Sequence, residues 1–308
     1  MANEMISKIL GLYAETSLHA GSGNSLGVID LPIQREAHTG WPCVYGSALK
    51  GPLRTLANEK DWVVEVFGPE QKKVGDNPND FHAGALSVGD ARLLLLPVRS
   101  LTSHFKWVTC PAILERMKAD YRRLGKAIEF SIPEVNGSNA LVTETTKDKL
   151  FLEELCFELT PQNLDSVISV VAPLMGEPEM KNRLHEQLVI VHNDIFNHLS
   201  RYATPVVPHI SIDSETKTTK GGALWYEESL PPDTLLYSAL VMQKGRKLDE
   251  KNNTTSSETL MENFSKLVKE KKYLQVGGNE TTGMGWCRMS LIALKIALKD
   301  DENDQSVK

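Results

Sequence analysis

The stretch His19-Ala-Gly-Ser-Gly-Asn-Ser-Leu-Gly-Val-Ile-Asp30-Leu-Pro-Ile-Gln-Arg35 is a glycine-rich loop that carries a single acid, and Gly46-Ser-Ala-Leu-Lys-Gly-Pro-Leu-Arg54 follows it. Because glycine has no Cβ, the backbone of such a loop can approach a bulky ligand closely. Lys50 and Arg54 supply positive charge that suits phosphate. Together the two stretches predict a surface that binds a polyphosphate chain, with Asp30 placed to act on it.

The residues on either side of this loop predict a strand and a helix. From Leu10 to His19, apolar and polar side chains alternate, which is typical of a half-buried strand and places His19 on its polar face. After Ser47, apolar residues recur at helical spacing, with Lys50 and Arg54 four positions apart on another stripe. Pro52 interrupts that pattern, so we expect it to kink the helix or to mark where the regular part begins.

Strand and helix patterns continue to alternate along the rest of the chain. Two β-α-β runs, one early and one late, predict a ferredoxin-like α+β domain with insertions in its middle. Residues 203–228 have a polar, glycine-ended centre, which predicts a long projecting hairpin. The other predicted strands are 85–99, 152–159, 184–191, 234–243 and one after Gly285. Four further helices are predicted: one after Pro111, one over 163–175, one capped by Asp194, and one that opens with a capping box, Thr255-Ser-Ser-Glu258.

Composition narrows the class of protein. The 308 residues are 41% hydrophobic and 24% charged, as in a soluble globular protein, and the net charge is −6. The negative net charge argues against a protein that binds nucleic acid through a uniformly basic surface, but it does not exclude a local basic groove. The four cysteines are far apart, which favours free thiols in a reducing, cytoplasmic compartment. No signal peptide or membrane span is predicted, and residues 299–308 read as an acidic, solvated tail.

Several enzyme classes lack their motifs here. The spacing of a nucleoside-triphosphate phosphate loop, of a dinucleotide-binding glycine motif and of an H-E-x-x-H metalloprotease is absent. The eight histidines show no metal-ligand spacing. Each remaining feature also has a structural interpretation: Asp30 as a turn or cap residue, Gly277–Gly285 as a turn before a strand, and Lys50 with Arg54 as a solvated helix face.

The functional interpretation of these features is chemical. Magnesium is commonly held by one or two carboxylates, with substrate phosphates and waters completing its shell. Asp30 beside a bound RNA strand would therefore suffice for metal-assisted phosphodiester cleavage. The backbone N–H groups of the Gly277–Gly285 loop could bind phosphate without a side-chain charge.

In combination, the motifs resemble those of a known family. The blocks His19-Ala-Gly-Ser-Gly, Asp30-Leu-Pro-Ile-Gln-Arg35 and Gly46-Ser-Ala-Leu-Lys-Gly51 occur in the order found in the RAMP superfamily of CRISPR proteins, and in particular in the repeated backbone subunit of the type III-B effector, the Cmr complex. Further blocks extend the resemblance over about residues 6–295, namely Pro97-Val-Arg-Ser100, Trp107-Val-Thr-Cys-Pro111, Gly221-Gly-Ala-Leu-Trp-Tyr-Glu-Glu228 and Gly277–Gly285.

The resemblance implies a modified ferredoxin-like or RNA-recognition fold in a single domain, 1–308, with palm, fingers and a projecting thumb at about 203–222. It implies copies stacked head to tail on a CRISPR guide RNA (crRNA), with other Cmr subunits as partners and no membrane. Complementary target RNA would be cut at six-nucleotide intervals by a divalent metal ion, expected to be Mg²⁺, held by Asp30. His19, Glu227 and Glu228 match blocks near the family's active site. The residues expected to contact RNA are Gly21, Gly23, Ser47, Lys50, Arg54, Arg99, Lys217, Lys220, Gly277, Gly278, Thr281, Thr282, Gly283 and Gly285.

Two alternatives remain open at this stage. A related CRISPR backbone subunit could hold guide RNA without cutting, and an unrelated phosphohydrolase could act alone on small substrates. Replacement of Asp30 separates the first from an endoribonuclease, because it should abolish cutting and preserve RNA binding.

Overall fold

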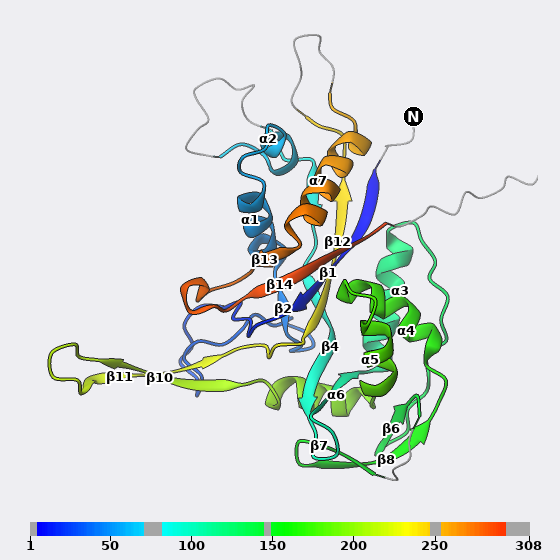
Figure 1. The fold of residues 1–308 in the computed structure, drawn as a ribbon, viewed down its shortest axis with the longest axis vertical. Coiled ribbons are helices and arrows are strands. Elements are labelled where there is room, and N and C mark those ends of the chain that lie inside the picture. The colour runs from blue at the N-terminus through cyan, green and yellow to red at the C-terminus, as the bar shows by residue number, and fades with distance from the viewer. Residues whose placement is uncertain (1–4, 71–81, 145–148, 247–253, 294–308) are drawn as a thin grey trace, which may run out of the picture.

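The computed structural model describes residues 5–70, 82–144, 149–246 and 254–293. One twelve-stranded mixed sheet runs through it, and a separate two-stranded hairpin projects from the side of the molecule (Figure 1). The predicted tail, residues 299–308, lies outside the described residues.

A ferredoxin-like unit forms one half of the sheet. Its strands lie in the order β14 (Trp286–Ala293), β1 (Ile6–Ala14), β12 (Leu235–Met242) and β4 (Ala91–Arg99), and every neighbouring pair is antiparallel. Helix α1 (Gly46–Leu56) separates β1 from β4 in the sequence, and α7 (Ser257–Lys271) separates β12 from β14. This is the β-α-β-β-α-β order, which confirms the predicted α+β class.

The insertions lie between β4 and β12 and extend the sheet. They add β5 (Phe105–Thr109), β6 (Asn139–Val142), β7 (Lys149–Leu152), β8 (Leu155–Pro161) and β9 (Leu188–Ile190), with helices α3 (Pro111–Arg123), α4 (Asp165–Val171), α5 (Met180–Gln187) and α6 (Asn193–Tyr202) and the 3₁₀ turn η3 (Ala172–Met175). The short elements β2 (Cys43–Val44), α2 (Val63–Phe67), β3 (Leu86–Val88), β13 (Tyr273–Gln275) and η4 (Glu280–Thr282) complete the described fold. Within the described ranges, no helix is long and apolar enough to span a bilayer.

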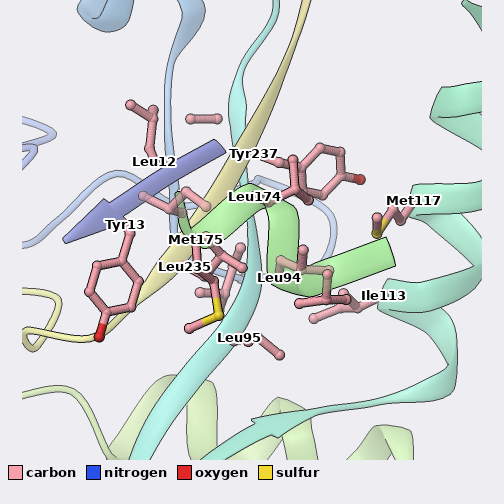
Figure 2. Packing of buried hydrophobic residues seen from close by; sticks show 14 of the residues in the cluster. Leu12, Tyr13, Leu94, Leu95, Ile113, Met117, Leu174, Met175, Leu235 and Tyr237 are labelled. Carbon is pink, nitrogen blue, oxygen red and sulfur yellow. The ribbon is translucent and has the colours of Figure 1, made fainter. Parts of the chain in front are cut away.

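Strand β1 is covered on both faces. Lys8 donates to Ser265 of α7 across 2.7 Å, whereas a Cβ built on Gly11 would lie only 2.1 Å from the Leu174 carbonyl of η3. Since residues 8 and 11 point to opposite faces of a strand, α7 and η3 enclose it. Figure 2 shows Leu174 and Met175 of η3 packed in this core. The predicted polar face is therefore wrong, because Ile9–Ala14 are buried without alternation.

Three predicted strands have other boundaries in the structure. The first half of the segment 184–191 is the end of helix α5, and the three-residue β9 follows. The segment 152–159 belongs to the hairpin β7–β8. The segment 85–99 is divided into β3 and β4 at Gly89-Asp90, where the Asp90 carboxylate accepts a hydrogen bond of 2.7 Å from Gly46 at the start of α1.

The helix starts also differ from the predictions. Helix α1 begins at Gly46 and continues through Pro52, so Pro52 does not mark its start. His192, not Asp194, caps α6, because its side chain accepts from the Asp194 N–H. Ser256 caps α7 by accepting from Thr259, one residue later than the predicted box. Helix α3 and strand β12 lie where they are predicted.

The predicted hairpin is present. Strands β10 (Val206–Ile212) and β11 (Thr219–Glu228) pair antiparallel, with an irregularity between Ile210 and Ile212, and they extend away from the body (Figure 1). Its apolar side chains stay exposed, since Ile210 is 50% exposed and Leu224 is 55% exposed. A hairpin that buries so little of its own apolar surface is suited to contact another molecule.

Candidate functional site

The Asp30 loop joins the projecting hairpin at its root. Leu31 donates to the Tyr226 carbonyl across 3.0 Å, and Glu228 donates to the Leu31 carbonyl across 3.0 Å. These bonds add the loop to β11 as a short parallel bridge. We call residues 17–35, 226–229 and 277–285 the hairpin base. The predicted catalytic residues Asp30, His19, Glu227 and Glu228 all lie in it.

Asp30 has a half-buried carboxylate with one fixed oxygen. Its Oδ2 accepts a hydrogen bond of 2.7 Å from the backbone N–H of Tyr226 in β11. Within the described part of the chain this is the one hydrogen bond to that carboxylate. The side chain is thus held against the hairpin, while Oδ1 has no hydrogen-bond donor among the described residues.

His19 is buried, with 8% of its surface exposed, and not on an open polar face as predicted. Its Nδ1 lies 2.6 Å from the Glu228 carbonyl, so Nδ1 carries the hydrogen and donates it. The other ring nitrogen, Nε2, faces Gly21, because a Cβ built on Gly21 would lie 2.8 Å from it. With Nδ1 committed in this way, Nε2 is the nitrogen that can exchange a proton with a ligand.

Glu227 and Glu228 point to different partners although they are neighbours. The Glu227 carboxylate, 7% exposed, accepts from the Asn279 side chain across 2.5 Å and lies 3.9 Å from His19 Nδ1. Glu228 is 2% exposed, and its two oxygens accept from Arg35 (2.5 Å), Thr204 (2.6 Å) and the Ile33 N–H (3.1 Å). Glu228 therefore fastens the Asp30 loop to the hairpin. A catalytic role for it stays a prediction.

The donor set of the hairpin base would give a metal ion one protein ligand. Among the described residues, no group of three or more His, Cys, Asp or Glu side chains is arranged to hold a metal. Among the described residues, Asp30 and Glu227 each keep one carboxylate oxygen without a hydrogen-bond donor, but Glu227 is only 7% exposed, and both oxygens of Glu228 accept hydrogen bonds. Such a site fits a cation that an RNA phosphate also binds, and it does not fit a permanently held structural metal.

The C-terminal glycine loop, residues 277–285, packs on the segment that carries His19. Gly278 donates to the His19 carbonyl across 2.9 Å, and Gly285 donates to the Ser17 carbonyl across 2.8 Å. Gly277 has φ +82°, and a Cβ there would lie 2.2 Å from the His19 oxygen. Thr281, Thr282 and Gly283 lie on the exposed side of the loop. Their predicted contact with RNA stays a prediction.

The predicted phosphate-binding residues of α1 already have partners. Lys50 donates to the Leu86 carbonyl across 2.9 Å, and burial, with the nearby Arg54 charge, lowers the pKa of Lys50. Arg54 donates to the Gly68 carbonyl and lies 3.7 Å from Glu70. Ser47 is exposed in the first turn. Binding of RNA by this helix would have to share or replace these contacts.

The other predicted RNA contacts are spread over the surface. Gly21 and Gly23 are exposed, and Gly23 has φ +97° with open space where a Cβ would be. Arg99 is exposed and paired with Glu153 at 2.5 Å. Lys217 and Lys220 are exposed beside the turn at the hairpin's far end. The structure brings none of these five residues to the Asp30 carboxylate by a hydrogen bond.

Sequence reasoning missed two residues of the hairpin base. Arg35 lies in the opening motif, yet no role was predicted for it; its guanidinium donates to Glu228, to the Gly40 carbonyl (2.8 Å) and to the Ser200 carbonyl (2.9 Å). Asn279 lies 52 positions from its partner Glu227. The one local signal is the residue type, because asparagine tolerates the left-handed backbone that it adopts here, with φ +61°.

Comparison with known proteins gives consistent results. The family model described as the RAMP superfamily matches residues 12–288. A curated Pyrococcus furiosus protein, "CRISPR system Cmr endoribonuclease Cmr4", is 36% identical over 303 residues, which cover 93% of this chain and 96% of that protein. A Saccharolobus solfataricus protein, "CRISPR system CMR subunit Cmr4", is 23% identical and covers 89% of this chain and 92% of its own length.

Solved structures agree with the sequence relatives. Oligomeric Cmr4 from Pyrococcus furiosus superposes with a TM-score of 0.70 at 30% identity, over 95% of this chain and all of that one. A chain of the type III-B Cmr-beta complex bound to cognate target RNA gives a TM-score of 0.71 at 21% identity, over 92% of this chain and 96% of that chain. The latter likeness supports the fold alone.

Proposed function

The chain belongs to the RAMP superfamily and, within it, to the Cmr4 family, and from this premise we propose that it is the repeated backbone subunit of a cytoplasmic type III-B effector. In this role it binds crRNA and cleaves complementary RNA at six-nucleotide intervals. Its partners are further copies of itself, the other Cmr subunits and the target RNA.

The placement of Asp30 is the observation that carries the proposal. Its carboxylate is anchored to the Tyr226 N–H at the root of the hairpin, and its second oxygen has no donor among the described residues. His19 and Glu227 lie in the same hairpin base. An accessible acid with a fixed orientation is what proton abstraction or metal binding at a phosphodiester requires.

The proposed cleavage uses a nucleophile within the RNA. A nucleotide displaced from the guide–target duplex can bring its 2′-oxygen into line with the adjacent phosphorus. The 2′-O–P bond forms, the P–O5′ bond breaks, Asp30 or the His19 Nε2 accepts the 2′-hydroxyl proton, and a proton goes to the leaving 5′-oxygen. The products would be a 2′,3′-cyclic phosphate and a 5′-hydroxyl.

Asp30 would be the protein ligand of a divalent metal ion, Mg²⁺ in our proposal. When bound, such an ion supplies positive charge to the phosphate, and phosphate and water oxygens fill its remaining positions. The donor set described above suits this arrangement, because Asp30 Oδ1 has no hydrogen-bond donor within the part of the chain that the structure describes.

The hairpin is the part we propose to displace the nucleotide. Its exposed apolar side chains, such as Ile210 and Leu224, could pack against an unstacked base. A head-to-tail row of copies would place one hairpin and one Asp30 at each repeat of the guide. Base pairing would then read the sequence, so that the protein needs only backbone and shape contacts.

The test is Asp30→Asn in the complete complex with its guide. The amide can still accept from Tyr226 N–H but is neither a base nor an anionic ligand, so we expect cutting to be lost while target binding stays within about twofold. Asp61→Asn, an exposed acid outside the hairpin base, is the matched control and should cut normally. If the wild-type complex with Mg²⁺ never cuts a complementary RNA, the chain is a guide-binding scaffold, and if Asp30→Asn cuts normally, another residue is catalytic.

A further inference from the structure

Asn279 connects the glycine loop to a buried acid. Its Nδ2 donates to Glu227 Oε1 across 2.5 Å, and Glu227 is only 7% exposed. Among the described residues, no other side chain or backbone group is found to donate a hydrogen bond to this carboxylate. A buried carboxylate with a single donor depends strongly on that donor, because losing it leaves the charge poorly solvated.

The same carboxylate lies beside the His19 ring. Glu227 Oε1 is 3.9 Å from Nδ1, which donates to the Glu228 carbonyl. The Glu227 carboxylate therefore lies on the Nδ1–H side of the imidazole. The three side chains thus form a series from Asn279 through Glu227 to His19, and the His19 Nε2 faces Gly21.

The loop that carries Asn279 is well fixed relative to His19. Gly278 bonds to the His19 carbonyl, and the Gln275 side chain donates to the carbonyls of Gly277 (3.2 Å) and Met284 (3.3 Å). A side chain whose supporting residues are fixed can keep the position of its hydrogen-bond partner to within a few tenths of an ångström. The loop therefore sets the position of the Asn279 carboxamide and, through it, that of Glu227.

We propose that Asn279 is a positioning residue of the RNA-cleavage site, which acts by holding the Glu227 carboxylate beside the His19 imidazole. This inference rests on the proposed endoribonuclease function. It makes the 277–285 loop part of the cleavage machinery and not only a surface for RNA.

The first test is Asn279→Gly in the reconstituted complex. Glycine keeps the left-handed backbone without strain, so the change removes only the carboxamide. We expect the single-turnover cleavage rate at saturating target to fall about 10- to 100-fold, as for other supporting residues of a reaction site. Target binding, measured with a chelator present, should stay within about twofold. Asp61→Asn, an exposed residue outside the hairpin base, should behave as wild type.

A double-mutant cycle with Glu227→Ala tests the route of the effect. If Asn279 acts through Glu227, adding Asn279→Gly to Glu227→Ala slows cleavage no further. Three outcomes would each overturn the inference. Asn279→Gly could cleave at the full rate, or it could bind RNA more weakly while its cleavage rate at saturating target is unchanged. The rate losses of Asn279→Gly and Glu227→Ala could also multiply in the double variant. Should Asn279→Gly fail to assemble, Asn279→Asp replaces the donor by an acceptor and is expected to slow cleavage equally. A wild-type complex that never cuts refutes the proposed function instead, so the two failures are distinguishable.

Discussion

The cysteine side chains differ sharply in their surroundings. Burial raises the pKa of Cys43 and Cys287 to about 12 and that of Cys110 to about 11, whereas Cys156 is exposed on β8. Since the thiolate is the reactive form, we expect Ellman's reagent at pH 8 to label one thiol rapidly in the native chain and all four after denaturation. Cys156→Ser should remove the rapid phase. A second rapid thiol in that variant would contradict the burial described here.

The predicted catalytic residues lie together in the hairpin base, but their contacts could not be predicted from the sequence. Order along the chain and the family resemblance indicated Asp30, His19 and Glu227, and all three lie in the hairpin base, although their roles stay predictions. The Arg35–Glu228 ion pair joins residues 193 positions apart. No periodicity or spacing carries information on such a pair, because it is created by how the loop and the hairpin are packed together.

Among the elements, the glycine loop 277–285 offers a matched pair of positions. Gly277 and Gly283 both have φ +82°, but only at Gly277 would a Cβ meet another atom, the His19 carbonyl oxygen at 2.2 Å. Alanine at Gly283 should cost only the backbone strain, about 1–2 kcal/mol in the free energy of unfolding. Alanine at Gly277 should lower the free energy of unfolding clearly more, because the loop must also move away from His19. Urea denaturation of both variants measures this, and equal losses would mean that the loop does not press on His19.

Local signals predicted the elements that depend on local structure. Helix α3 has Pro111 at its first turn and an apolar stripe, and the hairpin has a polar turn between two alternating strands. Strand β1 was misjudged because its second covering layer, η3, comes from about 160 residues later in the chain. Helix α5 was misjudged because it has only eight residues before β9 begins. Sequence reasoning failed where distant packing, not local propensity, decides burial.

At the scale of the whole molecule, both the charge and the shape of the chain favour RNA binding by an assembly over binding by a single copy. The net charge is −6, and the cations of α1 are already engaged by the Leu86 and Gly68 carbonyls and by Glu70. The hairpin extends away from the body with its apolar side chains uncovered (Figure 1). In a single copy, the cations of α1 are therefore already engaged, and the apolar hairpin stays uncovered unless a neighbour or a duplex packs on it.

Binding of RNA should accordingly be a property of the assembly. For single-stranded RNA, the logarithm of the binding constant falls with the logarithm of salt concentration by about 0.7 for each phosphate neutralised. We expect the isolated chain to bind guide RNA weakly, with a slope of about −1.4 or shallower between about 50 and 200 mM salt, which corresponds to about two phosphates. In the complete complex the slope should steepen with each added copy, because in the proposed row each copy would extend the RNA-binding groove of the next. Fluorescence anisotropy with labelled guide RNA measures both slopes. A scrambled RNA of equal length should give the same slope, because the proposed contacts are to the RNA backbone. If the isolated chain binds RNA with the same affinity and the same salt dependence as a copy in the assembly, the groove is complete within one chain.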